Sequence, residues 1–221
     1  QAGTGGRGSA IFNAGQLRVR DSTFTANTAE GPWGSPGRGG AIFNAGQLLV
    51  EATQFEGNQA TSDPNDFGGT LLYAGTGGAI FVDLGGHAIL VESLLERNFG
   101  DGGGAGLANH GGLTLRDSVL RDNTGGTGAG VLAHEESEVT IIGTTFINNQ
   151  NTVGTGSGGG IYASTNVSLT VIDSTFDGNR AYYGGGLLSY RARVTVTRST
   201  FSGNVAISEG GGLSTNGAVP S

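Results

Sequence analysis

Three side chains of the types needed for acid–base or metal chemistry occupy one position of a repeating pattern. Asp83, His110 and His134 each follow, by three residues, an apolar residue that ends a glycine-rich step. Two imidazoles beside a carboxylate can bind a transition metal or shuttle protons. Elsewhere the same position carries Ala14, Ala45, Ser164, Tyr190 and Asn216. Because these residues share no chemistry, we expect exposed turn residues here and assign no catalytic residue, metal or cofactor.

Carboxylates form the second candidate. Polysaccharide lyases and glycoside hydrolases need clustered carboxylates, which bind calcium or act as acid and base. One acidic residue stands three positions before an aromatic or leucine at Asp21, Glu92, Asp117 and Asp173. Other repeats have Ala52, Gly143 and Arg198 there, and nearby cations that could pair with the acids are Arg20, Arg116 and Arg121. We therefore expect a solvated face and keep a carbohydrate-active enzyme as the alternative.

Both positions belong to a phrase that recurs along the chain: a glycine-rich step into an apolar residue, then Phe-x-x-Asn. The aromatic or leucine position is filled by Phe24, Phe55, Leu95, Leu120, Phe146, Phe176 and Phe201. The asparagines are Asn27, Asn58, Asn98, Asn123, Asn149, Asn179 and Asn204. Successive asparagines lie 31, 40, 25, 26, 30 and 25 residues apart. Such a repeating unit predicts a solenoid.

Each repeat contains three short stretches in which apolar and polar residues alternate, as they do in β-strands. We therefore predict an all-β fold, a right-handed parallel β-helix (β-solenoid) with three short strands per coil and about seven full coils. We expect residues 1–221 to form a single domain without evident caps, as part of a longer chain or as a filament protomer. Stacking of coils would place the Phe/Leu position in a core column.

The glycines and asparagines have structural roles in such a fold. A glycine before the core residue permits positive φ and lets neighbouring coils approach closely. Asparagine tolerates the left-handed conformation, and stacked amides can hydrogen-bond along the axis. We therefore predict that the seven asparagines form an internal amide ladder at the turn after the third strand.

Composition limits the function. The chain has 221 residues, 45 of them glycine, no cysteine or methionine, and a net charge of −7. The negative charge argues against nucleic acid and anionic membrane surfaces, and no apolar run is long enough to insert into a membrane. The lack of cysteine excludes a disulfide framework and a thiol nucleophile. A chain without an initiator methionine is expected to be a processed product or a piece of a longer one.

Repeat length varies directly after the asparagine, at residues 28–38, 59–76 and 150–157. Since these inserts share one position in the repeat, we expect them on one side of the solenoid, where they could form a binding face. The insert residues suited to binding are Trp33, Asp63, Asp66, Phe67 and Tyr73.

The paired motif resembles the repeats of the chlamydial polymorphic outer-membrane proteins. Gly-Gly-Ala-Ile at residues 39–42 and 77–80 and Phe-Glu-Gly-Asn at residues 55–58 match it literally, and the other repeats match with substitutions. The resemblance covers essentially the whole chain and extends to other large bacterial surface proteins with β-helix stems. It implies a secreted, surface-displayed and adhesive passenger whose repeats take part in self-association.

We therefore expect a non-catalytic, extracellular structural or adhesive β-solenoid on a bacterial cell surface. Its expected partners are another copy stacked head to tail or the flanking coils of a longer chain, and a host-surface or glycan ligand. The alternative is a carbohydrate-active β-helix enzyme, similar to polysaccharide lyases or glycoside hydrolases, or a glycan-binding module. An ice-binding protein would need a flat, regular threonine array, and the irregular repeat lengths argue against one.

Overall fold

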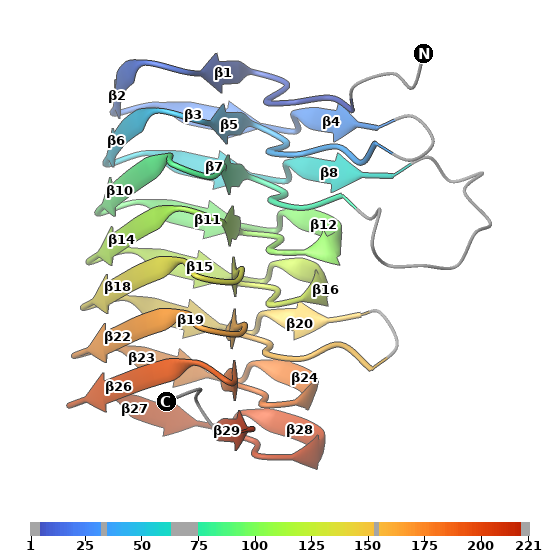
Figure 1. Ribbon diagram of the computed structural model, residues 1–221, viewed down its shortest axis with the longest axis vertical. Helices are drawn as coiled ribbons and strands as arrows, with labels where there is room; N and C mark the ends of the chain where they lie inside the picture. Colours follow the sequence, from blue (N-terminus) through green and yellow to red (C-terminus); the bar gives the residue numbers. More distant parts are fainter. Residues whose placement is uncertain (1–4, 32–34, 63–74, 153–154, 218–221) are drawn as a thin grey trace.

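The computed structural model describes residues 5–31, 35–62, 75–152 and 155–217 and shows a stack of coils (Figure 1). Each strand pairs in parallel with its equivalent in the next coil, so that the strands form four sheets along the stack. The chain is thus a parallel β-helix, as predicted. None of the described residues forms a helix long and apolar enough to span a membrane.

We name the sheets I to IV in the order in which a coil visits them. Sheet I contains β1 (Ile11–Asn13), β5 (Ile42–Asn44), β9 (Ile80–Val82), β13 (Leu107–Asn109), β17 (Val131–Ala133), β21 (Ile161–Ala163), β25 (Leu187–Tyr190) and β29 (Leu213–Asn216). Sheet II contains β2 (Gln16–Arg20), β6 (Gln47–Glu51), β10 (His87–Val91), β14 (Gly112–Arg116), β18 (Glu138–Ile142), β22 (Ser168–Ile172) and β26 (Arg193–Thr197). Sheet III contains β3 (Thr23–Thr25), β7 (Gln54–Glu56), β11 (Leu94–Glu96), β15 (Val119–Arg121), β19 (Thr145–Ile147), β23 (Thr175–Asp177) and β27 (Thr200–Ser202). Sheet IV contains β4 (Thr28–Glu30), β8 (Gln59–Thr61), β12 (Phe99–Gly103), β16 (Thr124–Thr127), β20 (Gln150–Asn151), β24 (Arg180–Tyr183) and β28 (Val205–Glu209).

The expected number of three strands per coil is wrong, because sheet IV adds a fourth strand directly after each asparagine. This strand escapes the alternation pattern because its inward residue is small. Buried examples are Ala29, Ala60, Gly100, Gly125 and Ala181. A small residue two positions after the repeat asparagine was the only available signal.

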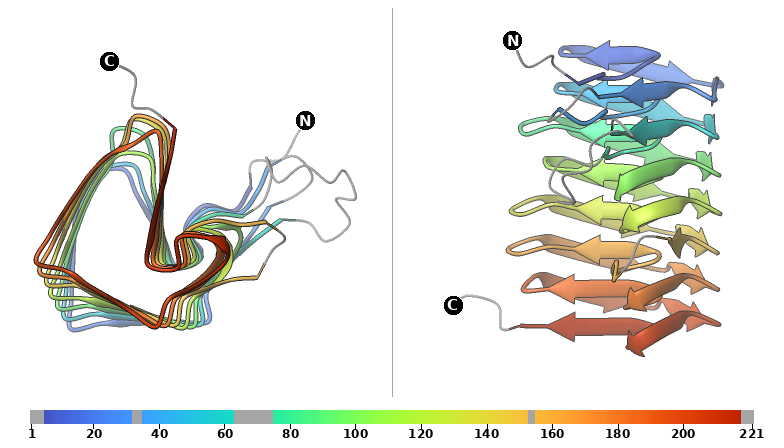
Figure 2. Two further views of the ribbon diagram at one scale, coloured as in Figure 1. Left: turned by 90° about the horizontal axis from the view of Figure 1, so that it is seen from below. Right: turned by 90° about the vertical axis from the view of Figure 1, so that its right-hand side faces the viewer.

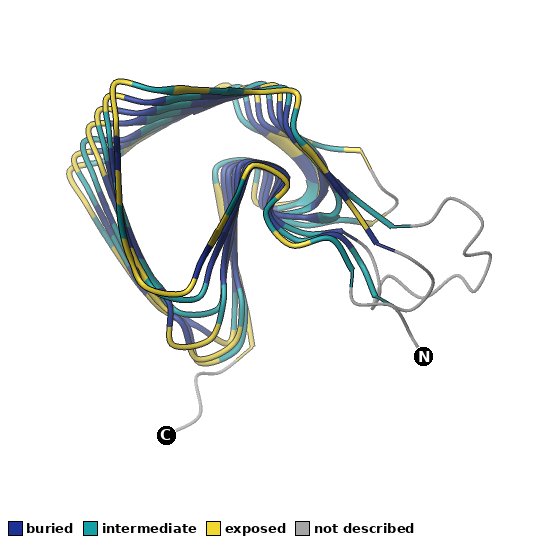
Figure 3. Ribbon diagram, turned by 90° about the horizontal axis from the view of Figure 1, so that it is seen from above, coloured by how far each residue is buried: buried dark blue, intermediate teal, exposed yellow. Residues whose placement is uncertain are grey.

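Sheets I, II and III enclose the main hydrophobic core. Figure 3 shows that buried residues recur at the same points of successive coils. The predicted core column stacks in register through sheet III. Its five inner members are fully buried: Phe55, Leu95, Leu120, Phe146 and Phe176. The rings of Phe146 and Phe176 lie parallel with centroids 4.7 Å apart. Each coil therefore adds one large apolar residue to a continuous column.

A second buried cluster covers the outer face of sheet I. It consists of Phe43, Phe81, Ala108 and Leu132. The segments that lead from sheet IV back into sheet I pack over this face, and the guanidinium of Arg38 lies 5.2 Å from the centre of the Phe81 ring. Sheet I is therefore buried on both faces over part of its length, which explains its almost uninterrupted apolar strands.

The glycine step adopts the predicted conformation. Gly39 and its counterparts in every coil have positive φ, three residues before the first core residue. A β-carbon on Gly40 would lie 2.0 Å from the carbonyl oxygen of Gly78 in the next coil. Only glycine permits this close approach of coils.

The extra residues of the three longer repeats follow the ends of equivalent strands, β4, β8 and β20 of sheet IV. Viewed along the axis, the described coils superpose along the strands of sheets I to III, differ at the turn from sheet I to sheet II, and diverge beyond sheet IV (Figure 2). The predicted insert residues lie outside the described residues: Trp33, Asp63, Asp66, Phe67 and Tyr73.

Candidate functional site

The structure brings the two histidines of the polar column into direct contact. His110 and His134 follow paired residues of β13 and β17, and their rings stack with centroids 3.6 Å apart and planes 16° apart. The Phe81 ring lies 5.1 Å from His110 on the other side. Asp83 occupies the equivalent position in the preceding coil, after β9. All three side chains are half-buried rather than the exposed turn residues that we expected. Gly126 and Thr127, on the segment that returns from sheet IV, lie beside His134.

This environment keeps both imidazoles neutral. Burial lowers the pKa of His110 to about 4, with a further decrease from Arg38 and an opposing effect of Asp83. Burial lowers the pKa of His134 to about 3, and His110 and Arg38 lower it further. Nε2 of His134 is buried without a hydrogen-bond partner among the described residues.

The stacked histidines lack the geometry in which two imidazoles share one metal ion. The nitrogen lone pairs of an imidazole lie in the ring plane, so two stacked rings direct them along parallel planes and not toward one ion. Across the part of the chain that the structure describes, no three His, Cys, Asp or Glu side chains are grouped to hold a metal. His110 and His134 therefore present ring nitrogens that can form hydrogen bonds.

A pocket of about 380 Å³ opens beside His134. We define the His134 pocket by the side chains of Thr127, Leu132, His134, Ser157, Tyr162 and Ser164 and by nearby glycine backbone. Tyr162 is half-buried, which raises the pKa of its phenol, and it hydrogen-bonds Ser164. Among the residues that the structure describes, no charged side chain lines the pocket. Tyr162 occupies the same outward position of sheet I as Phe43 and Phe81 in earlier coils. This recurring aromatic residue was the feature of the sequence that could have indicated the pocket.

The acidic column has a conformational role. Asp21, Glu92, Asp117 and Asp173 all have φ between 46° and 50° at the turn from sheet II to sheet III. Ala52 and Arg198 have the same left-handed conformation at this turn. The residues at this position therefore share a left-handed backbone conformation and not a common side chain. Asp tolerates this conformation better than most other non-glycine residues do.

Only part of the expected ion pairing around this column is present. Arg20 pairs with Asp21 at 3.2 Å. Arg198 binds Asp173 at 2.6 Å and lowers the pKa of this carboxyl group. Arg121 instead contacts Glu96, which lies on sheet III and is buried. The expectation that Arg121 pairs with the column is wrong because its side chain points outward from β15, next to the equivalent residue of β11.

The repeat asparagines form an unbroken amide ladder. From Asn27 to Asn179, each Nδ2 donates to Oδ1 of the next asparagine at 2.8–3.0 Å. The second Nδ2 hydrogen of Asn123 is donated to the carbonyl oxygen of Leu95 at 2.9 Å, and the same bond recurs from Asn58 to Asn204. The buried amides are thereby satisfied along the axis.

One detail of the predicted ladder is wrong. The left-handed residue is not the ladder asparagine but the residue before it, for example Arg97, Asp122 and Asn148. The ladder asparagine is needed for its amide, which points into the stack. A second amide–amide hydrogen bond, from Asn13 to Asn44 at 2.7 Å at the end of the sheet I strands, was not predicted.

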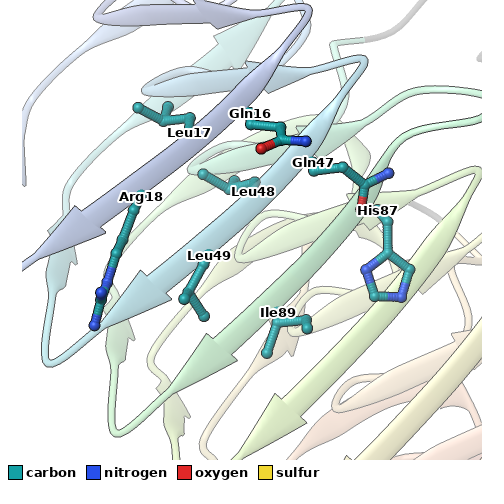
Figure 4. Close-up of a pocket in the computed structure, with 8 residues that line it drawn as sticks. All are labelled: Gln16, Leu17, Arg18, Gln47, Leu48, Leu49, His87 and Ile89. Atoms are coloured by element: carbon teal, nitrogen blue, oxygen red, sulfur yellow. The ribbon is translucent and has the colours of Figure 1, made fainter.

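A second hollow of about 460 Å³ lies on the outer face of sheet II (Figure 4). Gln16, Gln47 and His87 form one of its columns, and Leu49 and Ile89 form the next. The hollow spans β2, β6 and β10 on a sheet face without a covering element. Among the described residues that line it, every buried polar side-chain atom has a hydrogen-bond partner.

The same face carries four threonines in register: Thr114, Thr140, Thr170 and Thr195. The neighbouring outward column contains Arg116, Ile142, Ile172 and Thr197. A regular threonine array therefore does not extend across the sheet. The single column fits the preference of β-branched residues for strands.

The fold and comparisons with known proteins place the chain in a class. The chain belongs to the family described as the right-handed beta helix region, which matches residues 72–219 and establishes the right-handed coil. Residues 21–45 and 52–83 match the Chlamydia polymorphic membrane protein repeat. Together the matches indicate a repeat-built β-helix with an outer-membrane or cell-surface context. No curated protein and no solved structure matches the chain.

Proposed function

We propose that the chain is a non-catalytic structural and adhesive segment of an extracellular bacterial surface protein. The observation that carries this proposal is the division of each coil. Sheets I to III and the amide ladder repeat with constant register, and the inserts all leave from sheet IV. A stiff rod with variable segments along one edge suits the display of binding surfaces away from the cell.

The acidic column supports a non-catalytic role. Ala52, Gly143 and Arg198 interrupt the column in the same left-handed turn, so that only Glu92 and Asp117 lie in consecutive coils. Catalysis by two carboxylates needs a specific pair at a fixed separation. Activity on a polysaccharide panel, with Asp117→Ala and Asp173→Ala as variants, tests the enzymatic alternative; turnover that these changes abolish would replace our proposal.

The adhesive function is tested with coated beads. Beads carrying the folded chain should bind cultured epithelial cells better than beads carrying the same chain irreversibly unfolded by heat, with both preparations assayed at the same neutral pH. Equal binding by both preparations would contradict adhesion. The comparison keeps composition and charge constant, so that only the folded surface differs.

We further propose that coil stacking continues beyond the described coils, into flanking coils of a longer chain or into another copy. The described coils already pair through parallel backbone hydrogen bonds in four sheets, and the last strand, β29, pairs in sheet I. Light scattering and electron microscopy over a range of concentrations distinguish the two partners. Filaments that grow with protein concentration would support stacking of copies. A protein that stays monomeric at every concentration would contradict it, and the flanking coils of a longer chain would remain as the proposed partner.

A further inference from the structure

We propose that the His134 pocket binds a neutral sugar unit of a glycan. The inference rests on the proposed adhesive function and names the ligand class for one site. The pocket lies over consecutive coils, between the outer face of sheet I and the segments that return from sheet IV. Its volume of about 380 Å³ falls in the range of small-ligand sites, about 300–1,000 Å³.

The strongest evidence is the unpartnered imidazole nitrogen. Nε2 of His134 is removed from solvent and makes no hydrogen bond to any described residue. Leaving a buried polar atom unpaired is unfavourable, so that a ligand able to pair with it gains affinity. A sugar hydroxyl can donate or accept, and therefore satisfies this nitrogen in either imidazole tautomer.

The other lining groups favour a neutral, hydroxyl-rich ligand. Thr127, Ser157, Tyr162 and Ser164 supply hydroxyls, and the described part of the chain places no carboxylate, lysine or arginine side chain in the pocket lining. An anionic or cationic ligand would lose its hydration without gaining a charged partner there. Hydroxyl groups can exchange water for these side chains at little cost.

The apolar lining groups fit the remaining surface of a sugar ring. Leu132 and the Tyr162 ring come from neighbouring strands β17 and β21, where the two residues pair in register. One face of a hexose ring presents C–H groups, which pack against apolar and aromatic side chains. The pocket therefore combines an apolar wall with hydroxyls and one free nitrogen.

The test is a titration of the full chain with neutral oligosaccharides built from hexose and N-acetylhexosamine units. Binding is followed by calorimetry and by the imidazole nitrogen resonances of His134. We expect saturable binding that shifts these resonances. Loss of one buried hydrogen bond in His134→Ala should weaken it at least about tenfold. Tyr162→Phe, which keeps the ring, should weaken it about threefold or more.

His87→Ala is the matched control, because His87 lines the hollow on sheet II and not the His134 pocket (Figure 4). It should leave the affinity unchanged. Thermal unfolding of each variant verifies the fold. No saturable binding of any neutral oligosaccharide, or equal binding by wild type, His134→Ala and Tyr162→Phe, would overturn the inference. Failure of the coated beads to adhere overturns the adhesive function instead, so the two failures are distinguishable.

Discussion

Sheet II and sheet IV each stack one strand from every complete coil in parallel, but their strands differ in length and in the residues that they bury. Every strand of sheet II has five residues, and its register is unbroken from β2 to β26. Strands of sheet IV have two to five residues, and the pairings of β12 with β16 and of β24 with β28 contain register shifts. Sheet II contributes large residues such as Leu90 and Ile141 to the main core. Sheet IV instead buries small residues such as Ala60 and Gly125, which lie outside that core cluster.

The difference shows where this fold tolerates variation. A length change in sheet II would move its apolar residues to the opposite face, because side chains alternate along a strand. Sheet IV buries little apolar area, so that inserts after β4, β8 and β20 cost little stability. The ladder between sheets III and IV separates the constant part from the variable part.

The largest expected effect is at the ladder, where two adjacent asparagines provide a matched pair. Asn149→Ala removes the acceptor of the Asn123 amides and the donor to Leu120, and should cost about 5 kcal/mol of unfolding free energy. Asn148 is exposed and left-handed, with φ of 50°. Asn148→Ala should cost about 1 kcal/mol, and Asn148→Gly almost nothing. Chemical denaturation measures all three; equal losses at both positions would refute the role of the ladder.

The core column is the next test. Phe176→Ala should cost about 4 kcal/mol, because the fully buried ring stacks between two others. Phe12 on the outer face of sheet I is 55% exposed, and Phe12→Ala should cost less than about 1.5 kcal/mol. Equilibrium unfolding in urea compares the two variants. Similar losses would mean that the two faces of the coil are not distinct.

The stacked histidines make stability depend on pH. Their folded-state pKa values of about 4 and about 3 lie below the unfolded value of about 6.5. The unfolded chain therefore binds protons first, and the contribution is complete above pH 6.5 and decreases as the pH falls toward 3.

Between pH 7 and pH 5 the loss should reach about 3 kcal/mol, allowing for partial solvent exposure. The double variant His110→Asn/His134→Asn should lose this part of the pH dependence, which thermal unfolding at each pH measures. His87→Asn is the control. An unchanged pH profile in the double variant would show that the stacked pair does not titrate as described.

The smallest effect is expected at the surface. Asp173 and Arg198 form a short ion pair, but both side chains are about half exposed or more. Exposed pairs contribute about 0–1 kcal/mol. Asp173→Asn should therefore leave the urea midpoint of unfolding almost unchanged, and the small difference should vanish in high salt. A loss comparable to that of Phe176→Ala would contradict the assignment of this turn to solvent.

Sequence patterns were sufficient for the parts of the fold that depend on local alternation. Pairs such as Leu169 and Val171 revealed sheet II, and the Phe-x-x-Asn spacing revealed the core column and the ladder. Sheet IV was missed because residues such as Gly125 give no apolar signal. The left-handed residue before the ladder was missed because it can be arginine, aspartate or glycine.

The candidate site was harder to predict. The repeat alignment placed His110 and His134 in one column, but their burial depends on segments that return from sheet IV. The His134 pocket combines residues more than 30 positions apart, such as Thr127 and Ser164, whose approach follows from coil stacking. The partner of Arg121 likewise comes from the preceding coil. Such contacts need the register of neighbouring coils, which one repeat alone does not specify.

Native-state amide hydrogen exchange tests the division between constant and variable parts most directly. We predict the slowest exchange at the backbone amides of Asn98, Asn123 and Asn149, which donate to ladder side chains, and through sheet II. The amides of β16 and β20 should exchange about 100-fold faster, since local opening there exposes little apolar area. Equally slow exchange in sheet IV, or fast exchange at the ladder, would contradict the account.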